Sequence, residues 1–268
     1  NDYQGHTFHT SRWDYDYTGG DSNGNLENVK DKKVAIIGTG ATAVQCVPHL
    51  AASAKKLYVF QRTPSSIDER NNSDTDEKWF KSQKKGWQND RRENFEGFLT
   101  GSFSNRDLVN DGWTEIFRTI LGGLMNNGPS KLKIFSWVIS APFYSDFYKL
   151  GMKTYIRNEF MKFISRKDIS QKVEMIDFQK MEKVRKRAEE IVNDPQTAES
   201  LKPYYRQLCK RPCFHDEYLQ SFNNDNVELV DTDGKGVKEI NAKGIVHDEK
   251  EYEVDCIIFA SGFEVGTD

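Results

Sequence analysis

The sequence predicts an α/β fold with a Rossmann-like dinucleotide-binding sheet that is interrupted by a helical insertion. Three observations support this prediction. An apolar run, Lys33–Ile37, leads directly into a glycine-rich turn and an apolar-periodic segment, which is the pattern of a buried strand, a tight turn and a helix. A second β-rich run, Lys56–Phe60, follows at the distance expected of a β-α-β unit, and a third apolar run, Cys256–Phe259, comes after a long helix-favouring stretch.

Composition restricts the classes of function that fit the chain. Its 268 residues are 37% hydrophobic and 29% charged, with a formal net charge of −3. This length suffices for one large core or two smaller ones, and a chain without basic excess is not expected to bind nucleic acid. We identify no signal peptide and no apolar run long enough to span a membrane. Cys46, Cys209, Cys213 and Cys256 form no C-x-x-C pair, so we expect free thiols and a cytoplasmic location, and nothing specifies an oligomeric state.

The glycine-rich turn has the spacing of a dinucleotide fingerprint, Gly38-x-Gly40-x-x-Ala43. Gly38 allows the tight turn, Gly40 lets the backbone approach a pyrophosphate, and the small Ala43 lets helix and strand pack closely. The N–H groups at the start of the following helix would face the phosphates. The predicted cofactor contacts here are Gly38, Thr39, Gly40, Ala41, Thr42, Ala43 and Gln45.

The end of the second strand indicates which nucleotide binds. An NAD site places Asp or Glu roughly 20 residues beyond the glycines, where it holds the ribose 2′-hydroxyl. Here the corresponding place holds Gln61, Arg62 and Thr63, which suit a 2′-phosphate instead. We therefore predict NADP(H) binding, with Arg62 and Thr63 as contacts; the alternative is that Arg62 is merely a surface residue at a strand end.

The first fourteen residues are rich in aromatic side chains. His6 and His9 stand three apart, but no convincing third ligand is near, so we predict no metal site. The pattern Tyr3-x-Gly5-x-x-x-His9-x-x-x-Trp13-Asp14 resembles F-x-G-x-x-x-H-x-x-x-W-(P/D), the signature of type I Baeyer–Villiger monooxygenases in the flavin-containing monooxygenase superfamily. Tyr3 stands where the family usually has Phe. The resemblance implies that Gly5, His9, Trp13 and Asp14 belong to an interdomain connector in which the histidine influences domain motion.

Further motifs resemble the same family in the same order along the chain. Phe60–Pro64 is similar to its F-Q-R-T-P segment, in which Arg and Thr contact the 2′-phosphate. Lys210-Arg211-Pro212 resembles its Lys-Arg segment, and Asp255–Phe263 resembles the D-x-(I/V)-(I/V)-x-A-T-G-F strand of flavoproteins with two dinucleotide-binding domains. Ser261 replaces the Thr of that strand and keeps its hydroxyl; with Gly262 it is a predicted cofactor contact.

The resemblance implies a role for each residue of the basic pair. The position of Arg211 is the family's catalytic arginine, which stabilises a negatively charged flavin peroxide and the nicotinamide end of NADP. A guanidinium suits this role because it stays protonated and presents a rigid set of donors. Lys210 would add a point charge for the 2′-phosphate. From local sequence alone, two solvated basic residues on a loop remain the alternative.

We expect three regions along the chain. Residues 1–30 would form the connector that carries the signature, residues 31–75 and 203–268 the NADP-binding domain, and residues 76–202 the helical insertion. Within them we predict a helix that Asp194 caps ahead of Pro195, a strand at Asn226–Val230 and a hairpin between Gly236 and Val246. Helices are also predicted over Trp113–Met125, Ser130–Val138 and Ala141–Arg166, where aromatic residues such as Phe135 and Trp137 are expected in the core.

The resemblance implies that the parent protein is a monooxygenase dependent on FAD and NADPH, which inserts one oxygen of O₂ beside the carbonyl of a ketone to give an ester or lactone. The chain contains no second G-x-G-x-x-G, so we expect it to be part of a longer protein whose FAD-binding domain lies upstream. Alone it would bind NADP(H) without oxygenating a substrate. Two alternatives stay open: an N- or S-oxygenating flavin monooxygenase, against which Trp13-Asp14 and Arg211 argue, and a stand-alone NADP-binding module.

Overall fold

The computed structural model describes residues 2–72, 74–100, 106–116, 118–119 and 167–262. It divides into two compact units, one of Asn1–Glu69 with Met181–Asp268 and the other of Arg70–Lys180. We call them the sheet unit and the inserted unit. The second boundary between the two units lies between Lys180 and Met181, inside a helix, whereas the insertion was expected to end at residue 202. Met181, Val184 and Ala188, which follow this boundary, are buried and belong to the sheet unit.

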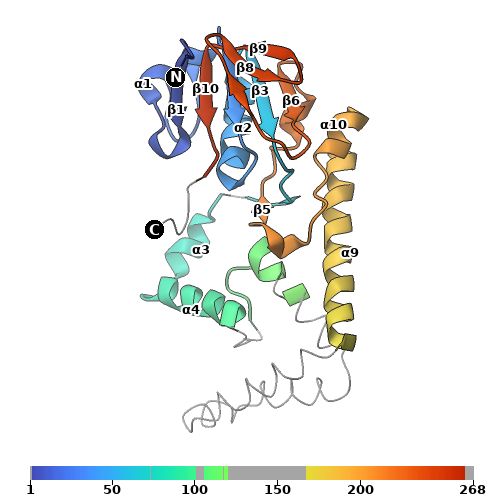
Figure 1. Ribbon diagram of the computed structural model, residues 1–268. Helices are drawn as coiled ribbons and strands as arrows, with labels where there is room; N and C mark the ends of the chain where they lie inside the picture. Colours follow the sequence, from blue (N-terminus) through green and yellow to red (C-terminus); the bar gives the residue numbers. More distant parts are fainter. Residues whose placement is uncertain (1, 73, 101–105, 117, 120–166, 263–268) are drawn as a thin grey trace, which may run out of the picture. The chain divides into compact units, whose positions relative to one another are not determined.

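The sheet unit is built on five parallel strands in the order β1-β10-β2-β3-β6 (Figure 1). Their bounds are β1 His6–His9, β2 Lys33–Ile37, β3 Lys56–Gln61, β6 Val227–Asp231 and β10 Cys256–Phe259. The three strands predicted from apolar runs are confirmed as β2, β3 and β10, and the predicted strand near Val227 is β6. The first residues of the chain contribute the edge strand β1, which pairs with β10.

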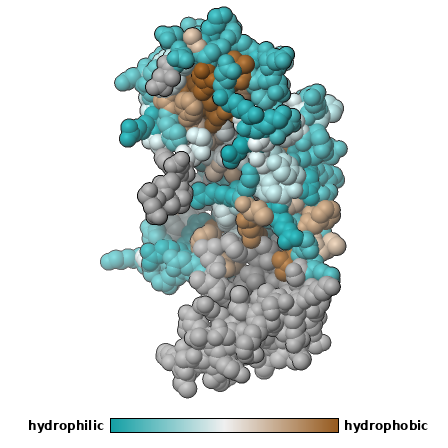
Figure 2. Space-filling view, viewed as in Figure 1, coloured by the Kyte–Doolittle hydropathy of each residue, from teal (hydrophilic) through white to brown (hydrophobic). Residues whose placement is uncertain are grey.

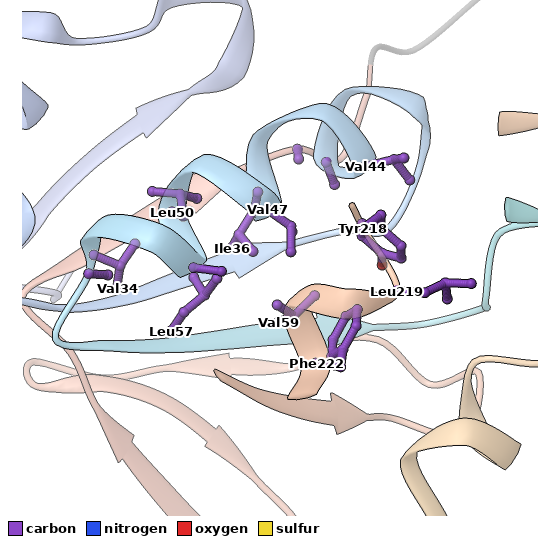
Figure 3. Close-up of a cluster of buried hydrophobic side chains, with 14 of the residues drawn as sticks. Val34, Ile36, Val44, Val47, Leu50, Leu57, Val59, Tyr218, Leu219 and Phe222 are labelled. Carbon is purple, nitrogen blue, oxygen red and sulfur yellow. The ribbon is translucent and has the colours of Figure 1, made fainter. Parts of the chain in front are cut away.

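Helix α2, Ala41–Ser53, connects β2 to β3 and confirms the predicted β-α-β unit. Val34, Ala35 and Ile36 of β2 are all 0% exposed, as expected of a strand covered on both faces of a parallel sheet. One face of the sheet is covered by α2, and Figure 3 shows its side chains pointing onto β2 and β3. Tyr218 and Phe222 complete this cluster in T-shaped contact, with ring centroids 5.2 Å apart.

A three-stranded antiparallel meander and the sheet share a second cluster of buried apolar residues, which includes Phe60, Ile245, Tyr252 and Ile257. It consists of β7 Glu239–Ile240, β8 Gly244–His247 and β9 Lys250–Glu253. The predicted hairpin is confirmed by the pair β7–β8, whereas β9 is a strand that the sequence analysis does not predict. Tyr252 of β9 meets Phe60 and Tyr58 of β3 edge-on, both at 5.2 Å between ring centroids, so the meander is packed onto the sheet.

Short elements complete the sheet unit. They are η1 Thr10–Arg12, α1 Tyr15–Thr18, η2 Glu27–Val29, β4 Ile67–Asp68, α10 Pro195–Ser200, η3 Gln207–Cys209, β5 Cys213–Phe214 and η4 Gln220–Asn223. The predicted cap of α10 is confirmed, because the Asp194 carboxylate accepts a hydrogen bond from Thr197 N at 2.8 Å. All four cysteines are free thiols, as expected.

Among its described residues, the inserted unit contains helices and no strand. Its first helices are α3 Glu77–Ser82 and α4 Trp87–Thr100. Trp79 of α3 meets Trp87 edge-on at 5.4 Å. Helix α9, Lys167–Ile191, begins in this unit and ends in the sheet unit. Of the predicted helix Trp113–Met125, the described residues 113–116 and 118–119 are helical. The predicted helices Ser130–Val138 and Ala141–Arg166, with their aromatic core, lie outside the described residues. No helix in the described part of the chain is both long and apolar enough to cross a bilayer.

Candidate functional site

The carboxyl ends of the parallel strands meet at one edge of the sheet. The parallel register pairs Ile37 with both Phe259 and Phe60, and Gln61 with Asp231, so the segments that follow these strands emerge side by side. The strand order reverses between β2 and β10, and in open α/β sheets ligands bind at such a reversal.

A cavity of about 740 Å³ lies at this edge. Most of the predicted cofactor residues line it: Gly38, Thr39, Gly40, Ala41, Thr42, Arg62, Thr63, Lys210, Arg211, Ser261 and Gly262. Part of its wall is apolar and comes from Ile37, Phe60, Val237, Ile240 and Phe259. Figure 2 shows a hydrophobic patch at the level of β8 and β10 on an otherwise hydrophilic face of the sheet unit. An apolar wall beside polar loops suits a nucleotide, whose base is apolar on its faces and whose phosphates are charged.

Glycine stands at positions 38 and 40 of the fingerprint for two different geometric reasons. Gly38 has φ +115°, and a Cβ there would lie 2.5 Å from the Ala260 carbonyl oxygen, so only glycine fits. Gly40 immediately precedes α2, and a Cβ there would meet nothing within 4 Å. The missing side chain of Gly40 therefore leaves open space at the N-terminus of α2, where the first backbone N–H groups have no partner within the helix. Open space beside free helix N–H groups is the arrangement at which dinucleotide-binding folds hold a pyrophosphate.

Hydrogen bonds hold the turn in place. Thr39 is 5% exposed, and its hydroxyl donates to the Thr63 carbonyl at 2.8 Å. The Ser65 hydroxyl in turn contacts the Thr39 carbonyl. The turn after β2 is thus tied to the segment after β3, which carries Arg62.

Two of the predicted cofactor residues lie away from the cavity. Ala43 is 0% exposed and belongs to the core between α2 and the sheet, in keeping with the close-packing role of the third fingerprint position. Gln45 is exposed, and its side-chain amide donates to the Ala41 carbonyl in the previous turn at 3.0 Å. The structure gives Gln45 no place on the cavity wall.

Four cationic side chains line the cavity: Arg62, Lys210, Arg211 and Lys235. Within the described residues none of them forms an ion pair with a carboxylate. The ammonium of Lys210 lies over the Tyr205 ring, 5.2 Å from its centroid. Partial burial, and then the nearby charge of Arg62, lower the pKa of Lys210. A concentration of positive charge without counter-charge is the electrostatic property of an anion site.

The signature residues lie at the β1 edge rather than in the cavity. Asp14 caps α1 by accepting from Tyr17 N at 3.0 Å, and this hydrogen bond is the main reason why the pKa of Asp14 is lowered. Its other oxygen lies 2.9 Å from His6 Nε2. The indole N–H of Trp13 donates to the Thr18 hydroxyl at 3.0 Å. At Gly5 a Cβ would lie 2.8 Å from the Asp255 carbonyl oxygen. These residues organise the entry of the chain into the sheet.

His9 is the signature residue that contacts the cavity lining. Its Nδ1 accepts a hydrogen bond from Ser11 N at 3.2 Å, so in the neutral ring the proton is on Nε2. Nε2 lies 3.2 Å from the carbonyl oxygen of Gly262, to which it therefore donates. His9 thus holds the turn after β10. The residues that the structure describes contain no group of three or more potential metal ligands.

The segment after β6 was missed by the sequence reasoning. Thr232, Lys235, Gly236, Val237 and Ile240 line the cavity, together with Ser65. Their position follows from β6 being parallel to β3, because the residue after a parallel strand joins the same edge. The signal was present in Asp233-Gly234-Lys235-Gly236, a turn sequence directly after a strand.

Comparison of the sequence with known proteins finds similar monooxygenases and a similar synthase. The chain is 50% identical over 262 residues to Baeyer-Villiger monooxygenase ATR8 of Stachybotrys chlorohalonatus, covering 98% of this chain and 37% of that protein. It is 48% identical to neopentalenolactone D synthase of Streptomyces avermitilis, again over 98% of the chain and 39% of that protein. No protein-family model matches the chain.

Solved structures show the same relationship. The polycyclic ketone monooxygenase from Thermothelomyces thermophila superposes with a TM-score of 0.72 at 40% identity, covering 98% of this chain and 38% of that one. A complex of OTEMO with FAD and NADP superposes with a TM-score of 0.59 at 26% identity, covering 98% and 43%. The chain therefore spans well under half of the length of the relatives it matches.

Proposed function

Because the chain belongs to the Baeyer–Villiger monooxygenase family along 98% of its length, we propose that it is the NADP(H)-binding part of a monooxygenase that depends on FAD and NADPH. The observation that carries the proposal is the set of unpaired cations opposite the glycine turn in one cavity. The N-terminus of α2 and the open space at Gly40 accept the pyrophosphate, and Arg62, Thr63 and Lys210 accept the 2′-phosphate.

The nicotinamide end of the cofactor would lie across β2 from the 2′-phosphate, near Ser261, Gly262 and Arg211, all of which line the same cavity. Arg211 is exposed and forms no ion pair with a described carboxylate, so its guanidinium is available to a negative charge that develops on the reacting groups. We assign it this stabilising role. His9 contributes by holding the Gly262 carbonyl.

The proposed reaction of the whole protein converts a ketone, O₂, NADPH and a proton into an ester or lactone, water and NADP⁺. The flavin, held mainly by residues outside this chain, supplies the activation of O₂ when bound. The similarity to a polycyclic ketone monooxygenase and to Baeyer–Villiger monooxygenases favours a carbonyl substrate over an N- or S-centre.

Titration calorimetry of the 268-residue chain with NADPH, NADH and FAD tests the cofactor assignment. We expect NADPH to bind more tightly than NADH, and Arg62→Ala to remove most of that preference. Arg12→Ala, which removes an exposed arginine of the same unit outside the cavity, serves as the control and should leave it intact. Equal binding of NADPH and NADH, or tight binding of FAD alone, would contradict the proposal.

A further inference from the structure

The loop between β6 and β7 is fastened to the end of β3. Thr232 is 0% exposed, and both its backbone N–H and its hydroxyl donate to the Gln61 carbonyl, each at 2.8 Å. The Thr232 hydroxyl also accepts from Gly236 N at 2.9 Å, and the Thr232 carbonyl accepts from Lys235 N at 2.9 Å. The backbone on both sides of Lys235 is therefore fixed relative to the residue that precedes Arg62.

The shape of this loop brings Lys235 and Arg62 to the same wall of the cavity. Asp233, Gly234 and Gly236 all have positive φ, at +48°, +78° and +72°, which gives a compact turn. A Cβ on Gly236 would lie 3.6 Å from Cδ of Arg62, so the aliphatic part of the arginine passes alongside the loop. Both Lys235 and Arg62 line the cavity, and both are exposed in it.

The charge of Lys235 is unbalanced, unlike that of neighbouring lysines. Lys243 lies 3.0 Å from a Glu253 oxygen, and Lys250 lies 2.8 Å from a Glu228 oxygen. Lys235 has no such carboxylate among the described residues, and it shares its cavity with Arg62, Lys210 and Arg211. Cations brought together in one cavity repel one another, and an anion bound among them reduces this repulsion.

We propose that Lys235 is a further specificity-determining residue, which contacts the 2′-phosphate of NADP(H) together with Arg62 and Lys210. This proposal rests on the proposed function, because it names an additional residue of the same cofactor site. The ligand group is a phosphate monoester, which carries close to two negative charges at neutral pH and three acceptor oxygens. Arg62, Lys210 and Lys235 supply it with three cationic donors from three different segments of the chain.

The test compares the binding of NADP⁺ and NAD⁺ to the 268-residue chain and its Lys235→Ala variant by titration calorimetry at low ionic strength. Lys238→Ala is the matched control, since Lys238 is an exposed lysine three residues further on that does not line the cavity. We expect Lys235→Ala to raise the Kd of NADP⁺ about five- to tenfold and that of NAD⁺ less than about twofold, tenfold being equivalent to about 1.4 kcal/mol. Lys235→Glu should weaken NADP⁺ binding further, because it repels the phosphate.

The outcomes separate this proposal from the one on which it rests. If wild type prefers NADP⁺ and Arg62→Ala removes the preference, but Lys235→Ala behaves like Lys238→Ala, the role of Lys235 is wrong and the cofactor assignment stands. If Lys235→Ala weakens NADP⁺ and NAD⁺ equally, the loop does not read the 2′-phosphate, and the proposal is again wrong. If wild type binds neither nucleotide, or binds both equally, the cofactor assignment fails and Lys235 loses its proposed ligand with it.

Discussion

Gly38 and Ala260 lie against each other at the point where the strand order of the sheet reverses. The chain turns after β2 with φ +115° at Gly38, and a Cβ on this residue would lie 2.5 Å from the Ala260 carbonyl oxygen. Because that oxygen belongs to the backbone after β10, a flexible side chain cannot relieve the contact by moving aside. The requirement for glycine here is a requirement of the fold.

The two fingerprint glycines should therefore respond differently to alanine. Gly38→Ala is expected to lower the free energy of unfolding by about 2 kcal/mol or more. The alanine would have to adopt a positive φ, which is unfavourable for residues with a Cβ, and its Cβ would clash with the backbone at Ala260. Gly40→Ala should leave stability within about 0.5 kcal/mol of wild type and still abolish tight NADPH binding, because its Cβ enters the open space next to α2. Urea unfolding and calorimetry measure the two effects, and a stable Gly38→Ala variant would contradict the interpretation.

NADP⁺ affinity should decrease at alkaline pH. The pKa of Lys210 is lowered by burial and then by Arg62, so its ammonium deprotonates at a lower pH than that of an ordinary lysine. As pH rises through that lowered pKa, the positive charge is lost and the 2′-phosphate is held less tightly. Binding at alkaline pH should therefore take up protons, because the bound phosphate favours the charged ammonium. Calorimetry in two buffers of different ionisation enthalpy measures this uptake. It should be smaller for NAD⁺, and a flat NADP⁺ profile to pH 10 would exclude the effect.

The contact between His9 and Gly262 should affect the cavity from outside it. In His9→Ala the Gly262 carbonyl loses its hydrogen-bond donor, so we expect faster amide hydrogen exchange over 260–262. We also expect the affinity for NADPH to fall about two- to fivefold, which corresponds to the loss of one exposed hydrogen bond. His9→Gln, whose amide can still donate, is the conservative comparison and should recover part of both. If exchange at these amides is the same in wild type and His9→Ala, the contact has no positioning role.

Asn226 is expected to stabilise the sheet unit through helix α2. Its side-chain amide donates to the carbonyls of Ala51 and Ala54, at 2.9 and 2.8 Å, and so pairs groups that the end of a helix leaves without partners. Asn226→Ala should lower the free energy of unfolding by about 1–2 kcal/mol. Asn224→Ala removes an exposed side chain two residues earlier and should change stability by less than about 0.5 kcal/mol. Similar urea midpoints for the two variants would contradict the assignment.

The elements that carry local signals could be predicted from the sequence. Short local patterns of residues determine the strands at Lys33–Ile37 and Lys56–Phe60 and the glycine turn between them. The cap at Asp194 likewise depends only on its immediate neighbours. The cavity residues of these segments were predicted for the same reason. The role of Arg62 as a phosphate ligand stays a prediction, since its position is consistent with that role without testing it.

What could not be predicted depends on contacts between distant parts of the chain. Lys235 reaches the cavity only because β6 pairs with β3, and a single sequence does not state which strands are neighbours. Likewise β9 was not distinguished from β10, because Val254-Asp255 between them carries no Gly or Pro to mark the change. Gln45 was counted as a cofactor contact from its place in the motif, yet its amide bonds to its own helix.

The strand order has a consequence for how the protein is made. Strands β2 and β3 are synthesised early, but their outer neighbours, β10 and β6, begin only at Cys256 and Val227. A ribosome-bound chain that has reached residue 200 thus holds a two-stranded β-α-β unit with both edges unpaired and one face uncovered. Pairing over such long separations is slow and exposes apolar surface meanwhile. We therefore expect the nascent chain to depend on chaperones until β6 and β10 have emerged, and shortened chains that lack β10 to aggregate rather than fold.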